Sequence, residues 1–244
     1  PVHKFMFERF IHNHLNDFTI FNNYSARDQF IDKGFRPDKI MVIQNAIETD
    51  NYAAYKTKQY DGLIRIISVG RFVKQKDYVT ALNSFSNLVK NTGKRNFEYY
   101  IIGYGPLEQE IRSLAKNLDV DKFVKILINP PNIHSLLREC DIFLSTSLFE
   151  GVSNSIMEAM IAGLPVVATD VGDNKYLIDN GYNGFLIPCK NVDQIVEKLE
   201  VLSESEAKRK EFGINSRKKI EIGFSKEKMV DSYLSFFSDV IRLY

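Results

Sequence analysis

From about residue 63 onward, short apolar runs alternate with amphipathic stretches. The apolar runs are rich in β-branched residues, which is typical of parallel strands covered on both faces. The stretches between them repeat apolar residues at helical spacing. Strand–helix–strand repetition predicts an α/β fold with a doubly wound, Rossmann-like parallel sheet and right-handed crossovers. The predicted strands are residues 63–69, 97–103, 123–128, 141–146, 164–169 and 184–188, and the predicted helices are residues 76–90, 107–117, 133–139, 154–162, 174–179 and 192–202.

The two ends of the chain depart from this alternation. Residues 18–22 and 39–44 read as short strands on either side of a helix at 26–33. Residues 225–242 predict a C-terminal helix with aromatic residues on its apolar face.

Ligands bind to sheets of this kind beyond the carboxyl ends of the strands. Arg71, Tyr104, Asn129, Ser147 and Asp170 each follow a predicted strand. Because parallel strands end at the same edge, we expect these residues to share one edge of the sheet.

Composition narrows the function classes only slightly. The chain is 44% apolar with a net charge of +1, so bulk electrostatics do not favour nucleic-acid binding. No stretch approaches the ~18 apolar residues that span a bilayer. Cys140 and Cys189 lie among apolar residues and are expected to be free core thiols. The basic run from Lys208 to Lys219 alternates with acids and predicts a solvated helix face, with attachment to a membrane surface as the lesser alternative.

No metal site is expected. His12 and His14 would share a face if their segment were extended, but further ligands at suitable spacing are missing. Polar residues at a surface or interface are the preferred interpretation of both.

Two carboxylates mark the passage from a loop into a predicted helix. Glu150 and Glu158 stand eight positions apart, and Gly151 between them allows a ligand to approach the backbone closely. Ser153 or Asn154 could cap the helix. The free N–H groups of a helix end suit a phosphate, and a carboxylate one turn further in could accept hydrogen bonds from a ribose. The arrangement predicts a nucleotide-sugar site.

A cationic group follows the first predicted strand. Arg71 comes directly after Gly70, and Lys76 lies five residues further on, with Lys74 as a nearby alternative. An arginine can hold two phosphate oxygens, and a lysine adds a mobile point charge. Both would stabilise the charge that builds on a departing diphosphate. The competing interpretation is a pair of solvated surface residues.

Taken in order along the chain, these motifs resemble glycosyltransferase family 4, whose members have the GT-B fold and retain anomeric configuration. The likeness runs from about residue 19 to the C-terminus. It rests on Glu150-x7-Glu158 followed by EAM-x-x-G-x-PVVATD-x-G, on Gly70-Arg71 with Lys76, on the turn Gly103-Tyr104-Gly105-Pro106, and on residues 43–46, which are similar to the connector V-x-N-G.

Four positions depart from the family's pattern. Asn129 stands where glycine often follows the third strand, and Ala46 replaces the connector glycine. Asp173 replaces a glycine of the usual V-G-G-N, and Tyr176 stands where a glutamate is common. Because Asp173 lies beside the donor loop, it bears on the sugar specificity.

The resemblance implies the roles of the site residues. The implied catalytic residues are Glu150, Arg71 and Lys76, and the implied donor-binding residues are Gly70, Arg71, Lys76, Gly151, Val152, Ser153, Asn154 and Glu158.

The resemblance also implies the activity. The enzyme would transfer a hexosyl unit from a UDP- or GDP-sugar, with a UDP-sugar favoured, to a glycan or lipid-linked acceptor, with retention and without a cofactor. The alternatives are a nucleotide-sugar binding or scaffold module without catalysis, and another GT-B chemistry such as a glycogen-type or a sucrose-phosphate-type synthase, which a screen of donors that includes ADP-glucose would separate. The expected setting is bacterial polysaccharide biosynthesis in the cytoplasm, with peripheral contact at the inner face of the plasma membrane as an option.

The domain organisation follows from the same resemblance. Residues 1–50 would be the tail of an N-terminal domain plus the connector, 51–222 the nucleotide-sugar-binding domain, and 223–244 a C-terminal crossing helix. The chain also has no initiator Met. We therefore expect the N-terminal acceptor domain to be missing, so that this piece would bind nucleotide weakly and transfer little.

Overall fold

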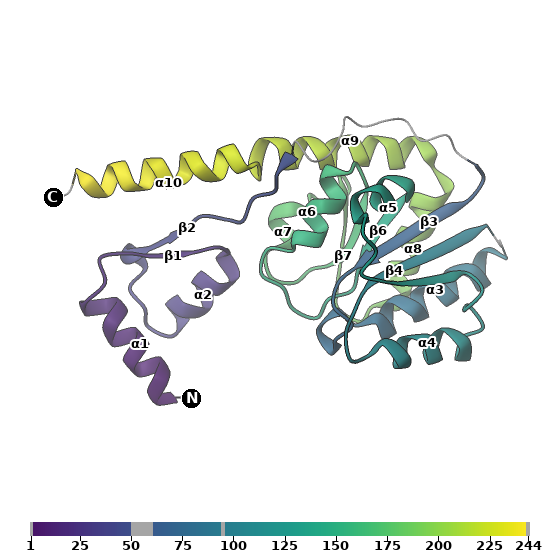
Figure 1. Ribbon diagram of the computed structural model, residues 1–244, viewed down its shortest axis with the longest axis horizontal. Helices are drawn as coiled ribbons and strands as arrows, with labels where there is room; N and C mark the ends of the chain where they lie inside the picture. The colour runs from purple at the N-terminus through teal and green to yellow at the C-terminus, as the bar shows by residue number, and fades with distance from the viewer. Residues whose placement is uncertain (1, 50–60, 94–95, 243–244) are drawn as a thin grey trace.

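A six-stranded parallel sheet forms the main body of the protein. The structure is a computed structural model that describes residues 2–49, 61–93 and 96–242. The strands lie in the order β5-β4-β3-β6-β7-β8. The chain begins the sheet at the central strand β3, adds β4 and β5 on one side, and then adds β6, β7 and β8 on the other; Figure 1 labels β3, β4, β6 and β7. This order is that of a doubly wound, Rossmann-like sheet, as predicted. The strands are β3 Ile64–Val69, β4 Phe97–Gly103, β5 Val124–Ile128, β6 Ile142–Ser145, β7 Val166–Thr169 and β8 Gly184–Ile187.

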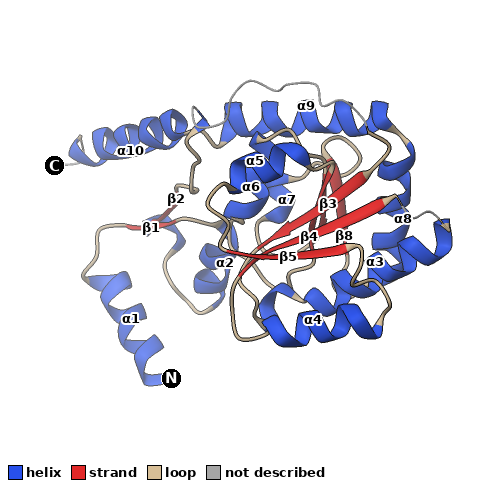
Figure 2. Ribbon diagram, turned by 45° about the vertical axis from the view of Figure 1, so that its right-hand side comes forward, coloured by secondary structure: helices blue, strands red, loops and turns tan. Residues whose placement is uncertain are grey.

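Helices cover both faces of this sheet (Figure 2). One face packs against α3, α4 and α8, and the other against α5, α6 and α7. The long helix α9 contributes Phe212 to the first core and Ile220 to the second. The bounds are α3 Tyr78–Thr92, α4 Glu108–Asn117, α5 Ile133–Glu139, α6 Asn154–Ile161, α7 Asn174–Leu177, α8 Val192–Glu204 and α9 Glu206–Gly223.

Successive residues of a central strand enter opposite cores. On β3, Ile66 packs into the core beneath α3, whereas Ile67 packs into the core beneath α6, and both are fully buried. Side chains alternate between the two faces of a strand, so a strand covered on both sides must be apolar throughout. This requirement explains why the strands were visible in the sequence as short uninterrupted apolar runs.

Side chains at the helix ends set where the helices begin. The predicted helix 76–90 instead starts at Tyr78, because the Asp77 carboxylate accepts hydrogen bonds from the amide and the hydroxyl of Thr80. Lys76 therefore ends a short 3-10 turn, Lys74–Lys76, rather than beginning the helix. Among the residues described here, five other helices begin with a side chain that accepts from the third helical amide, namely Asn23, Asn132, Asn191, Ser205 and Ser225.

The N-terminal segment forms a small unit of its own. A two-stranded parallel sheet joins β1, Thr19–Phe21, to β2, Ile40–Val42, with α2, Tyr24–Asp32, between them. These elements confirm the predicted strands and helix. Helix α1, Val2–His14, was not predicted, because its hydrophobic pattern is weak.

The helical state of α1 corrects the interpretation of its histidines. Two residues apart on a helix, His12 and His14 point in different directions. His12 is buried, with its ring nitrogens bonded to the Thr19 hydroxyl at 2.7 Å and the Arg36 carbonyl at 3.1 Å, while His14 is exposed. His12 therefore lies at the interface between α1 and the segment that follows it, whereas His14 lies at the surface, and these are the two settings that were expected.

The C-terminal helix lies beside this N-terminal unit. α10, Lys226–Ile241, continues from the end of α9 and extends away from the sheet towards the N-terminal elements (Figure 1). The rings of Phe18 and Phe236 meet edge to face at 5.4 Å. At the base of α10, the Ile47 amide donates to the Phe224 carbonyl at 2.9 Å.

Two expectations about single side chains were wrong. Cys140 is buried as expected, but Cys189 is exposed because it lies in the turn after β8, past the end of the sheet. Within the basic run, Arg209 is buried and donates to the Leu202 and Ser203 carbonyls at the end of α8. Arg209 thus closes the junction between α8 and α9.

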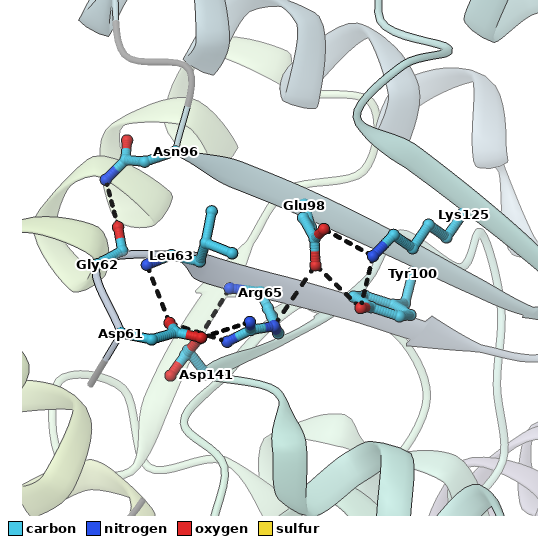
Figure 3. A network of polar contacts seen from close by, with 9 residues as sticks. All are labelled: Asp61, Gly62, Leu63, Arg65, Asn96, Glu98, Tyr100, Lys125 and Asp141. Atoms are coloured by element: carbon cyan, nitrogen blue, oxygen red, sulfur yellow. Dashed lines mark hydrogen bonds and ion pairs between the residues drawn. The ribbon is translucent and has the colours of Figure 1, made fainter. Parts of the chain in front are cut away.

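A charged network ties together the amino-terminal ends of the strands (Figure 3). Arg65 on β3 pairs with Asp61 at 2.6 Å and with Glu98 on β4 at 3.4 Å. Glu98 also accepts from Lys125 on β5 at 2.6 Å and from the Tyr100 hydroxyl at 2.9 Å. Burial alone would raise the pKa of Glu98, but the bonds from Lys125 and Tyr100 hold it below its ordinary value.

We expect Glu98→Gln to lower the free energy of unfolding by up to about 1 kcal/mol at pH 7, as for other partly exposed ion pairs. The folded-state pKa lies below the unfolded one, so the contribution is present above the unfolded pKa of about 4.3 and is lost as the pH falls through the folded value. Urea unfolding at pH 7 and at about pH 3 measures this difference. A gap that persists unchanged at about pH 3 contradicts the electrostatic origin.

Candidate functional site

The carboxyl ends of the six strands lie at one edge of the sheet, because every neighbouring pair is parallel. The residues predicted to follow strand ends therefore share that edge. Asn129, in the position that is often glycine, adopts φ 43°, the left-handed conformation that asparagine tolerates better than most residues. The turns after β3 and β6 carry the predicted site residues.

The turn after β3 is held by the turn after β4. Gly103 has φ 155°, and a Cβ there would lie 1.9 Å from the Gly70 carbonyl oxygen, so only glycine fits. The Phe72 amide donates to the Tyr104 carbonyl at 2.7 Å. At Gly70 itself, an added Cβ would lie 3.0 Å from Cε of Lys76. The Lys76 side chain therefore passes directly over Gly70.

Lys76 makes an ion pair with Glu150. Its Nζ donates to Oε1 of the carboxylate, which also accepts from the Ser147 hydroxyl at 2.7 Å. Only 16% of the Lys76 side chain and 9% of the Glu150 side chain are exposed. An ion pair so shielded from water is stronger than one on the open surface. The pair joins the turn after β3 to the loop after β6.

Further contacts reinforce this junction, and the sequence did not reveal them. The Gln75 side-chain amide donates to the Phe149 carbonyl at 2.8 Å, and the Gln75 carbonyl accepts from the Leu148 amide at 2.8 Å. The Thr146 hydroxyl lies 3.0 Å from the Lys76 carbonyl. The side chains of Gln75 and Thr146 bond to main-chain carbonyls, which any residue type supplies, so no side-chain motif identified them in advance.

The turn after β7 supports the same loop from a third side. Gly172 has φ 55°, and a Cβ there would lie 2.0 Å from the Glu150 carbonyl oxygen. The Asp173 amide donates to the Gly151 carbonyl at 3.2 Å. Glu150 is thus held through its side chain and packed at its main-chain carbonyl, and Gly151 is held through its main-chain carbonyl.

Arg71 and Lys74 remain exposed beside this junction. In the described part of the chain, neither side chain makes a hydrogen bond or ion pair with another residue. Of the two lysine candidates, Lys76 is the one joined to Glu150. The Arg71 guanidinium is free to meet an anion from solution.

The amino end of α6 differs in detail from the expectation. Ser153 occupies the cap position, but its hydroxyl bonds no helical amide and lies 3.2 Å from the Ser155 hydroxyl. Asn154 is the first helical residue and is exposed, so it is not a cap, and Val152 packs against the core beneath α6. Without a side-chain cap, the first amides of α6 keep their capacity to bind an anion.

Glu158 lies on α6, more than one turn inside the helix. Its carboxylate is partly buried and has no hydrogen-bond or ionic partner among the residues described here. Burial raises the pKa of Glu158 above its usual value. No direct bond connects Glu158 or Arg71 to the Lys76–Glu150 pair within the described ranges. A carboxylate that is shielded and unpaired is ready to accept hydrogen bonds from a ligand.

Asp173, which departs from the family's pattern beside the donor loop, contacts other protein groups and is shielded from solvent. Its carboxylate is fully buried and accepts from the amides of Tyr24 at 2.7 Å and Ser25 at 2.8 Å. The rings of Tyr24 and Tyr176 also meet, with centroids 4.6 Å apart. Both departures in this motif, Asp173 and Tyr176, therefore face the beginning of α2.

No group of three His, Cys, Asp or Glu side chains that could hold a metal ion occurs within residues 2–49, 61–93 and 96–242. Over the same ranges, no helix combines the length and the apolar character needed to cross a membrane.

A family model supplies the wider context of this edge. The model of the glycosyl transferases group 1 matches residues 54–219, about two thirds of the chain. The chain belongs to this family. It is 31% identical over 205 residues to the amylovoran biosynthesis glycosyltransferase AmsK of Erwinia amylovora, an alignment that covers 81% of this chain and 50% of AmsK.

A second relative shows the same relation of lengths. The UDP-Gal:alpha-D-GlcNAc-diphosphoundecaprenol alpha-1,3-galactosyltransferase of Escherichia coli is 26% identical over 215 residues, covering 84% of this chain and 55% of the relative. The chain therefore spans about half the length of the curated relatives it matches.

Two solved structures share the fold. Anabaena HepE, crystallised with UDP, superposes with a TM-score of 0.87 at 20% identity, covering 97% of this chain and 68% of HepE. A mutant of S. aureus TarM, solved with fondaparinux, alpha-GlcNAc-glycerol and UDP, gives a TM-score of 0.81 at 24% identity, covering 94% and 46%. At these identities the likeness establishes the fold alone.

We expect Glu158→Gln to stabilise the folded chain at pH 7 by a few tenths of a kcal/mol, the scale typical of substitutions outside the core. Because the folded-state pKa of Glu158 is raised, the ionised carboxylate costs stability above its unfolded pKa, and glutamine removes that cost. Thermal unfolding at about pH 4 and at pH 7 tests this, with exposed Glu197→Gln as the control. A destabilised variant at pH 7 indicates that Glu158 has a favourable partner.

Proposed function

We propose that this chain is the donor-binding half of a retaining glycosyltransferase of the GT-B type that resembles family 4. One observation carries the proposal. The shielded Lys76–Glu150 pair joins the two predicted donor loops at the carboxyl edge of the sheet, next to the unpaired guanidinium of Arg71. In this proposal residues 1–50 are the tail of an N-terminal domain and the connector, residues 51–222 are the donor domain, and residues 223–244 are the crossing helix.

The cationic residues have a direct use in this reaction. A lysine ammonium carries three N–H donors. One N–H of Lys76 donates to Glu150, which leaves the other two for a phosphate. Arg71 can add a forked contact to the same diphosphate. As the glycosidic bond breaks, negative charge builds on the leaving diphosphate, so fixed cations stabilise the transition state more than the ground state. Arg71 and Lys76 are the proposed catalytic cations.

The carboxylates and the helix end orient the rest of the donor. Glu158 would accept hydrogen bonds from the ribose hydroxyls, which supplies the partner that its carboxylate lacks within the described chain. Glu150 and the amides of Gly151, Val152 and Ser153 would orient the sugar at the uncapped start of α6. Gly70 allows Lys76 to reach this position.

The relatives guide the choice of substrates. HepE and TarM were each solved with UDP, and the E. coli relative is named for UDP-Gal and a diphosphoundecaprenol-linked acceptor. We therefore favour a UDP-sugar over a GDP-sugar as donor, and a glycan or lipid-linked acceptor. The proposed setting is polysaccharide biosynthesis in the cytoplasm.

Titration calorimetry with UDP, GDP and ADP tests the donor assignment. We expect UDP to bind the wild-type chain, and Arg71→Ala to weaken UDP binding by about 1–3 kcal/mol, the contribution of a hydrogen bond to a charged group. The loss should shrink at high salt because the contact is exposed.

Arg138→Ala is the matched control. Arg138 is also an exposed arginine, but it lies at the end of α5 that leads into the start of β6, at the opposite edge of the sheet. Its removal should leave UDP affinity unchanged. Equal losses for the two variants, or a well-folded wild-type chain that binds none of the three nucleotides, would refute the proposed function.

A further inference from the structure

The Asp173 carboxylate meets the beginning of α2 with both of its oxygens. Oδ2 accepts from the Tyr24 amide at 2.7 Å, and Oδ1 accepts from the Ser25 amide at 2.8 Å. These are the first two amides of the helix, which have no carbonyl partner within it. A negative charge at this end also matches the helix dipole. Asp173 therefore supplies the hydrogen-bond acceptors and the negative charge that stabilise the start of α2.

The main chain of Asp173 faces the donor loop. Its amide donates to the Gly151 carbonyl at 3.2 Å, and the preceding residue, Gly172, packs against the Glu150 carbonyl. Asn23, the cap of α2, reaches the same loop, with Nδ2 only 3.2 Å from where a Cβ of Gly151 would lie. A single residue thus contacts the N-terminal segment through its side chain and the Glu150–Gly151 loop through its backbone.

From this geometry we infer that Asp173 is a positioning residue, which fixes the Glu150–Gly151 loop against the start of α2 and so keeps Glu150 aligned with Lys76. The hydrogen bonds of Asp173 are observed in the structure, whereas the effect of Asp173 on sugar binding rests on the proposed function. Glycine at this position would leave both α2 amides without an acceptor, and asparagine would offer one oxygen where two amides need one each. The carboxylate is the side chain that serves both amides.

Tyr24→Pro and Tyr24→Ala separate the hydrogen bond from the ring contact. Proline is favoured at the first position of a helix, and Asn23 before it is already extended at φ −155° and ψ 150°, as a residue before proline must be. Proline removes the Tyr24 N–H and places a ring carbon towards Asp173. Alanine loses the same aromatic ring but keeps the N–H. The difference between the two variants therefore reports on the bond to Asp173.

Amide hydrogen exchange at residues 149–153 is the first measurement. We expect exchange in Tyr24→Pro to be faster than in Tyr24→Ala by about tenfold or more, the scale of losing one hydrogen bond to a charged group. Asp173→Gly should act in the same direction. If Asp173→Gly does not fold, the two Tyr24 variants decide alone. Equal exchange in Tyr24→Pro and Tyr24→Ala overturns the inference.

The second measurement distinguishes positioning from simple support of the fold. Wild type, Tyr24→Pro and Tyr24→Ala are titrated with UDP and with UDP-glucose, UDP-galactose and UDP-N-acetylglucosamine. Tyr24→Pro should reduce the extra affinity that a UDP-sugar has over UDP, while UDP affinity stays within about twofold, or about 0.4 kcal/mol. Faster exchange together with an unchanged sugar increment also overturns the inference.

The outcomes for the two proposals remain distinct. A wild-type chain that does not bind UDP, or that binds no UDP-sugar better than UDP, contradicts the proposed function at the nucleotide or the sugar respectively. The exchange comparison needs no ligand and in that case decides the role of Asp173 by itself. Glu48→Gln is the control, because it removes a 2.8 Å ion pair that joins the N-terminal segment to Lys226 at the start of α10, away from the donor loop. It should change neither measurement.

Discussion

The pairing of Lys76 with Glu150 connects two loops that are 74 residues apart in sequence. Each loop follows a different parallel strand. The pair is shielded from solvent, and the side chains of Gln75 and Thr146 donate hydrogen bonds to main-chain carbonyls beside it. Because a shielded ion pair is strong only while both partners are held in place, the surrounding backbone contacts and the pair depend on each other.

The two edges of the sheet differ in whether all of their charged side chains have protein partners. At the amino edge, Arg65, Glu98 and Lys125 satisfy one another across three strands, and this network supports the fold. At the carboxyl edge, the charges of Arg71 and Glu158 lack partners among the described residues, and α6 begins without a side-chain cap. Unpaired polar groups cost stability. Their concentration at the edge where doubly wound sheets bind ligands is the physical basis of the proposed donor site.

Much of the architecture could be predicted from local pattern. The six parallel strands appear as apolar runs because residues such as Ile66 and Ile67 enter opposite cores. Predictions failed where a helix cap or a weakly periodic helix decided the outcome. The pattern placed Lys76 at the start of a helix, but the Asp77 cap moved that start to Tyr78. Helix α1, which buries His12 against the segment that follows it, was not predicted because it has little hydrophobic periodicity of its own.

The sequence by itself determined the order and kind of the sheet's elements, the edge at which ligands are expected to bind, and the residue types gathered there. These follow from periodicity and from the rule that parallel strands end together. Only the tertiary structure decided that Lys76 rather than Lys74 meets Glu150, and that Asp173 turns its carboxylate to α2 instead of the sugar side. Such choices depend on which amides and cations the folded chain brings within hydrogen-bond distance, and a linear pattern carries no information about distances between segments remote in sequence.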